Sequence, residues 1–86
     1  MNVPAARQIV FDSLMELGVE TPTILFEASM LKNGYFVGRK FVFEGYTASW
    51  LAESDLIRIW AGTDLVREIT GEGESRESEK ILKKAA

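Results

Sequence analysis

The stretch that decides the fold is Ile24–Phe43, which reads ILFEASMLKNGYFVGRKFVF. Asn33 and Gly34 divide it into two hydrophobic runs of similar length. Asn-Gly strongly favours a two-residue type I′ turn, because both residues tolerate a positive φ and the twist of the turn matches that of the strands. We therefore predict a β-hairpin in which Lys32 lies opposite Tyr35.

This turn predicts which side chains share a face, because side chains alternate along a strand with a period of two. The inner face is predicted to carry Ile24, Phe26, Ala28, Met30, Val37, Arg39, Phe41 and Phe43. The opposite, outer face pairs Glu27 with Lys40, a favourable cross-strand charge pair. Gly38 lies inside the second strand, which indicates a β-bulge or a close contact across the sheet.

The residues after the hairpin predict that the meander continues. A turn at Glu44-Gly45 leads to a third strand, whose inner-face residues are Tyr46, Ala48, Trp50 and Ala52. Leu56–Ala61 alternates as a fourth strand with Ile57, Ile59 and Ala61 inside. Residues 65–70 fit a fifth, edge strand or a single helical turn, and the β-branched residues favour the strand.

Val3–Leu17 has the pattern of an amphipathic helix. Asn2 can cap it, Pro4 suits its first turn and Gly18 can end it. Its apolar stripe consists of Ala6, Ile9, Val10, Leu14 and Leu17. We therefore expect an α+β fold in which an N-terminal helix packs on the inner face of a four- to five-stranded antiparallel β-meander.

The composition changes after the meander. Residues 1–70 are predicted to form a single α+β domain, and residues 71–86 a polar tail that is disordered or a short helix. The chain has 86 residues, which makes burial marginal, so a partner or unusually good packing would help.

Composition excludes several functional classes. The chain has no cysteine and no histidine, which removes the usual thiolate and imidazole nucleophiles, bases and metal ligands. A net charge of −3 argues against nucleic-acid binding. No apolar run is long enough to span a bilayer and the first residues lack a signal-peptide pattern. We expect a cytoplasmic protein with no cofactor, metal or membrane partner, and no enzyme, because no carboxylate pair is placed for acid–base work.

The outer face is more apolar than the solvated face of an antiparallel sheet usually is. Its predicted apolar residues are Leu25, Leu31, Phe36, Val42, Leu51 and Trp60. Such a patch usually marks an interaction surface, so we expect a non-enzymatic module that binds a protein partner or a second copy of itself. Alternatively, the C-terminal segment folds back over this face through Ile81 and Leu82, or the sheet curls to shield it.

Arg39 is unusual because it falls on the otherwise apolar inner face, opposite Trp50. In a structural role its stem packs on the indole while its head reaches solvent or a carboxylate of the helix, Asp12 or Glu16. The alternative function is small-molecule or anion binding between helix and sheet. The residues of that predicted site are Arg39, Trp50, Tyr46 and Tyr35.

The run from Met30 to Phe41, MLKNGYFVGRKF, followed by Ala48–Glu53, ASWLAE, resembles a group of small bacterial proteins with no assigned activity. The resemblance covers about the central third of the chain. It implies a bacterial source and the same layout of one helix and a β-meander.

Overall fold

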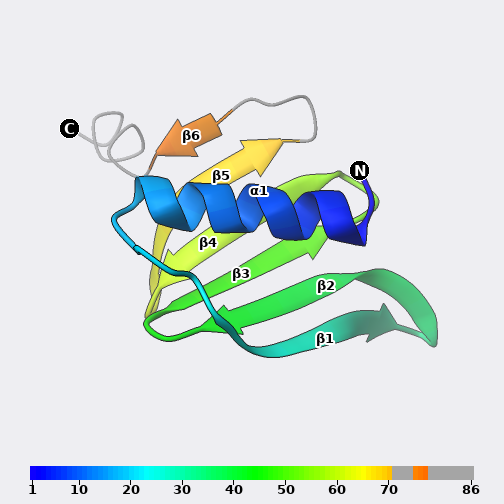
Figure 1. Ribbon diagram of the computed structural model, residues 1–86. Helices are drawn as coiled ribbons and strands as arrows, with labels where there is room; N and C mark the ends of the chain where they lie inside the picture. Colours follow the sequence, from blue (N-terminus) through cyan, green and yellow to red (C-terminus); the bar gives the residue numbers. More distant parts are fainter. Residues whose placement is uncertain (71–74, 78–86) are drawn as a thin grey trace.

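One helix packs on an antiparallel sheet in the computed structural model, which describes residues 1–70 and 75–77 (Figure 1). The sheet order follows the chain, β1-β2-β3-β4-β5-β6, so every strand lies beside its sequence neighbour. The elements are α1 (Val3–Glu16), β1 (Ile24–Lys32), β2 (Tyr35–Phe43), β3 (Tyr46–Leu51), β4 (Leu56–Ala61), β5 (Asp64–Thr70) and β6 (Ser75–Glu77). The predicted α+β meander is confirmed, and residues 65–70 belong to a strand.

Helix α1 begins and ends as its sequence indicates. The side chain of Asn2 accepts a hydrogen bond of 2.9 Å from the backbone N–H of Ala5. Gly18 follows the helix with φ of 103°, a backbone conformation that residues other than glycine rarely adopt. Ala6, Val10 and Leu14 are fully buried, so the helix contributes one stripe to the core.

The core lies between α1 and the inner face of the sheet. The register places Phe41 opposite Ala48, and Ala48 opposite Ile59, and all three are fully buried. Trp50 and Ile57 form the next row. The prediction for the inner face of β2, β3 and β4 is therefore confirmed at these positions.

The register of the β1–β2 hairpin differs from the prediction in its middle. Lys32 pairs with Tyr35 and Ile24 pairs with Phe43, as expected, but two bulges lie between these pairs. Val37 is an extra residue on β2, and Leu25 is an extra residue on β1. Each bulge shifts the pairing by one residue, so the second restores the register that the first changes.

The shifted pairing reverses the faces of β1 between the bulges. Glu27 pairs with Phe41, and Ser29 pairs with Arg39, so these polar residues of β1 lie on the inner face. The predicted pair of Glu27 with Lys40 is wrong, since Lys40 pairs with Ala28. Phe26, Ala28 and Met30 were expected inside, and they lie on the outer face opposite Val42, Lys40 and Gly38.

Gly38 lies next to the bulge at Val37. A Cβ atom built on this glycine would lie 2.1 Å from the backbone oxygen of Trp50 and 2.7 Å from the terminal methyl group of Met30. No side chain fits there, so β2 and β3 approach closely only because residue 38 is glycine. Both the bulge and the close contact that the sequence indicated are present.

The sheet continues further than the sequence indicated. Strand β6 pairs with β5 antiparallel, with Glu68 opposite Arg76, within the segment that was expected to be a polar tail. Its short length and charged sequence gave no strand signal. Residues 71–74 and 78–86 lie outside the described part of the chain, and so do the predicted cover by Ile81 and Leu82 and the predicted C-terminal helix.

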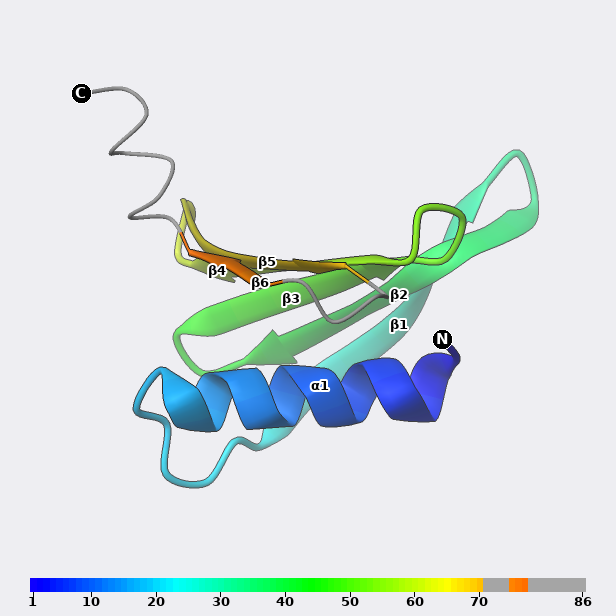
Figure 2. The same cartoon turned by 90° about the horizontal axis from the view of Figure 1, so that it is seen from above.

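The β1–β2 hairpin extends past the N-terminal end of α1, and its turn rises away from the helix side of the sheet (Figure 2). The helix therefore covers the central strands but not the tip of the hairpin. Within the described residues, α1 is the single helix, and it is too short and too polar to cross a lipid bilayer.

Candidate functional site

The large exposed apolar side chains gather on the β1–β2 hairpin. Of the seven such residues in the described part of the chain, five belong to this hairpin, and the other two are Met1 and Met15. The hairpin residues are Leu25, Phe26, Leu31, Tyr35 and Phe36. The exposed fraction reaches 66% at Leu31 and 75% at Tyr35. Leu25 and Phe26 lie near the base of the hairpin and Leu31, Tyr35 and Phe36 near its turn, so the exposed apolar residues are concentrated on one element rather than spread over the surface.

Strand β1 is also an edge of the sheet. It pairs with β2 on one side, and no described strand pairs with its other side. From Phe26 to Lys32 the strand contains no bulged residue and no proline. These are two of the devices with which proteins protect an edge from pairing with another strand, whereas a third, an inward-pointing charge, is present at Glu27.

A cluster of two arginines around one carboxylate joins α1 to this edge. Glu27 accepts hydrogen bonds from Arg7 of the helix at 2.7 and 3.0 Å, and from Arg39 of β2 at 2.7 Å. Arg39 also donates to the hydroxyl of Ser29 at 2.9 Å. The side chain of Glu27 is 13% exposed, and its negative charge is compensated by these two arginines within the fold.

This cluster lowers the pKa of the Glu27 carboxyl below its ordinary value. The hydrogen bond from Arg7 is the largest cause, and the hydrogen bond from Arg39 acts in the same direction. Burial opposes them, because it penalises the charged form. The two arginines lower the pKa more than burial raises it, so Glu27 is an anion at neutral pH although it lies on the core side of the sheet.

The four residues predicted to form a ligand site do not come together. Arg39 lies opposite Trp50, as expected. Tyr46 is at the other end of β3, four residues or about 13 Å from Trp50 at the rise of a strand. Tyr35 is exposed at the hairpin turn. The anion-binding role of this set stays a prediction.

The contacts of Arg39 differ from the prediction, and Trp50 has a hydrogen-bond partner and an aromatic neighbour. The expected partners of Arg39 on the helix are wrong, because Asp12 accepts from Gln8 and Glu16 pairs with Arg67 at 2.6 Å. The indole N–H of Trp50 donates to Asp55 at 3.0 Å. Its ring lies 6.2 Å from that of Phe36, centroid to centroid.

The six predicted interface residues occupy three places. Val42, Leu51 and Trp60 lie on the outer face, where the prediction put them, and each is partly buried. Phe36 contacts Trp50 and so lies on the inner side, with Leu31 opposite it. Leu25 is the bulged residue of β1. Their role in an interface stays a prediction.

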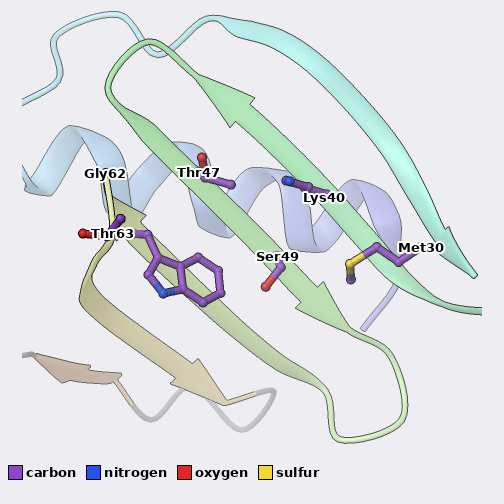
Figure 3. A pocket seen from close by; sticks show the side chains of 7 residues that line it. Met30, Lys40, Thr47, Ser49, Gly62 and Thr63 are labelled. Carbon is purple, nitrogen blue, oxygen red and sulfur yellow. The ribbon is translucent and has the colours of Figure 1, made fainter.

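The outer face contains an open groove of about 530 Å³. Met30 lies at one end and Gly62 and Thr63 at the other, with Lys40, Thr47 and Ser49 between them (Figure 3). Trp60 completes the lining. The groove was missed in the sequence because Met30 was expected on the inner face, and the bulge at Val37 moves it here.

The described residues contain no group of three or more acidic, histidine or cysteine side chains arranged to hold a metal ion. Comparison with known proteins gives no match to a family model, a curated protein or a solved structure. Functional inference therefore depends on the geometry of the hairpin, the ionic cluster and the groove.

Proposed function

We propose that this protein is a non-enzymatic interaction module that self-associates through the β1–β2 hairpin. The observation that supports the proposal most strongly is the concentration of exposed apolar side chains on that hairpin. Burying each large side chain would contribute about 1.5–3 kcal/mol. Two copies that meet there would shield part of the apolar surface that the helix leaves uncovered.

The edge of β1 supports a second copy as the partner. Antiparallel pairing of two β1 strands about a two-fold axis would join the sheets and satisfy the backbone groups of both edges. Glu27 is the acidic residue of β1, and Arg7 and Arg39 neutralise it within each copy. Two such strands can therefore approach each other without repulsion between their glutamates.

The test is the solution mass of the wild-type protein and of Leu31→Glu, measured by sedimentation from low to high micromolar concentration. Leu31 is two-thirds exposed, so the substitution leaves the folded monomer intact. An interface through the hairpin would desolvate the new carboxylate in apolar surroundings, and burying an unpaired charge is costly. We expect the dissociation constant to rise by at least about tenfold.

Met15→Glu is the matched control. Met15 is 52% exposed on α1, so this substitution adds the same charge and removes a similar apolar side chain away from the hairpin. It should leave the mass unchanged at every concentration. A wild-type protein that stays monomeric throughout, or an equal effect of both substitutions, would refute self-association through the hairpin.

The alternative of anion binding by Arg39 is less favoured by the contacts. Its guanidinium already donates to Glu27 and Ser29, and an incoming anion would have to displace Glu27. The cluster accounts for the charge of Arg39 on the inner face without a ligand.

A further inference from the structure

We propose that the outer-face groove is a binding site for a small, planar, apolar molecule that carries one anionic group. This inference does not rest on self-association, because the groove lies on the outer face of the sheet, and Met30 is the one described residue of β1 in its lining. Its volume of about 530 Å³ is within the range of about 300–1,000 Å³ that is usual for small-molecule sites.

The charge of the lining supports an anionic ligand. Among the described residues that line the groove, Lys40 is the single ionisable side chain and none carries a carboxylate, although acidic residues outnumber basic ones in the chain. Lys40 makes no ion pair with any described residue. The nearest other cation in its cross-strand row, Arg58, is held by Glu68 at 2.9 Å.

The neutral polar groups of the lining can all donate hydrogen bonds. They are the hydroxyls of Thr47, Ser49 and Thr63 and the indole N–H of Trp60. Within the described residues these groups make no hydrogen bond through their side chains. A ligand rich in acceptor atoms, such as a carboxylate or a sulfonate, would satisfy them together with Lys40.

The apolar part of the lining supports a planar body for the ligand. Trp60 lies opposite Thr47 in the register, so its indole borders the hydroxyl-bearing strand. Met30 lies at the far end of the groove, where its methyl group passes over Gly38. An aromatic ring can stack on the indole and contact the polarizable thioether, while its anionic group reaches Lys40.

The first experiment titrates the full-length protein with naphthalene-1-sulfonate and follows the backbone and indole N–H resonances by NMR. We expect saturable shifts at Ser49, Thr63 and the indole of Trp60, and little change at the buried indole of Trp50. Naphthalene-1-sulfonamide has the same shape without the charge. It should bind about three- to fivefold more weakly, the effect of one exposed charge pair.

Matched lysine variants locate the charge. Lys40→Met keeps most of the stem and removes the cation, and we expect it to weaken sulfonate binding about three- to fivefold without affecting the sulfonamide. Lys32→Met makes the same change at the hairpin turn, outside the groove, and should have no effect. Thr47→Val, which removes a hydroxyl at nearly constant volume, should weaken binding of the sulfonate.

The proposal fails if the probe gives no saturable shifts, or if the sulfonate and the sulfonamide bind equally well to the wild-type protein. It also fails if the shifts fall on Leu31 and Phe36 of the hairpin and disappear in Leu31→Glu, because the probe would then report the exposed arm. Since Leu31→Glu leaves the groove unchanged, binding to the groove should persist in that variant whether or not the protein self-associates.

Discussion

At the scale of single residues, Glu27 has the most consequential environment in the protein. Among the described residues, it is the one carboxylate that two arginines from different elements hold at 2.7 Å. One arginine comes from α1 and the other from β2, so the charge of Glu27 ties the helix to the edge of the sheet. A second ion pair, between Glu16 and the buried Arg67, ties the other end of the helix to β5.

The lowered pKa of Glu27 predicts how stability depends on pH. A carboxyl whose folded pKa is depressed stabilises the fold above its unfolded pKa, about 4.3, and this stabilisation is lost as pH falls through the folded value. We expect Glu27→Gln to cost about 1–2 kcal/mol at pH 7, less than a fully buried charged pair because both arginines are partly exposed. The difference between the two proteins should shrink below about pH 4.

Urea unfolding of the wild type and of Glu27→Gln, measured from neutral pH to pH 3, checks this expectation. Asp12→Asn is the control, because the one described partner of Asp12 is the neutral Gln8 on the helix surface. A Glu27→Gln difference that stays constant down to the lowest pH would mean that the carboxylate contributes through packing rather than charge.

At the scale of the elements, the hairpin shows what the sequence could predict. Asn33 and Gly34 both adopt a positive φ, and the pairs at both ends of the hairpin are as expected. The predicted pairing in the middle of the hairpin was wrong, because a strict alternation of side chains assumes strands without a bulge. One extra residue moves the side chains that follow it to the opposite face of the sheet. Gly38 indicated a bulge, but a glycine does not specify which neighbour is extra.

The same reasoning limits what could be predicted of the candidate site. Arg39 was recognised as an unusual residue of the inner face, and it lies there. Its partner Glu27 was assigned to the outer face, so the ionic cluster could not be found. A register with one extra residue at Val37 places Ser29 opposite Arg39. In that register a polar stretch of β1 faces a basic residue, and this is the sequence pattern that would have indicated the cluster.

Gly38→Ala tests the close approach of β2 and β3. The new Cβ would meet the backbone oxygen of Trp50 at 2.1 Å, so the strands must separate. We expect a loss of about 2–3 kcal/mol in the free energy of unfolding, in the range for overpacked cores. Chemical denaturation measures this loss directly.

A second substitution identifies the contact responsible. Met30→Ala removes the other close atom, the terminal methyl group at 2.7 Å, but leaves the backbone oxygen in place. The double variant should therefore remain as unstable as the two single changes predict together. Recovery of stability in the double variant would show that the methionine, rather than the backbone of β3, requires glycine at this position.

At the scale of the whole molecule, a short helix covers only part of a wide sheet. The chain has 86 residues, and domains of this size bury just enough surface to be stable. The exposed arm of β1 and β2 adds apolar surface that the monomer does not bury. Self-association through this arm would therefore raise the stability of the fold as well as join two copies.

This coupling predicts a thermal midpoint that depends on protein concentration. If the folded chain associates and the unfolded chain does not, mass action stabilises the fold as concentration rises. For a hundredfold increase we expect the midpoint of the wild type to rise by roughly 5–10 °C, given the small unfolding entropy of a domain of this size. Circular dichroism in cells of different path length covers such a range.

Leu31→Glu and Met15→Glu separate the two sources of stability in the same measurement. The midpoint of Leu31→Glu should rise less with concentration than that of the wild type and should match it at high dilution, because its monomer core is intact. Met15→Glu should retain the wild-type concentration dependence. If all three proteins melt at midpoints independent of concentration, the hairpin contributes nothing to stability through a second copy, and its apolar side chains must serve a different partner.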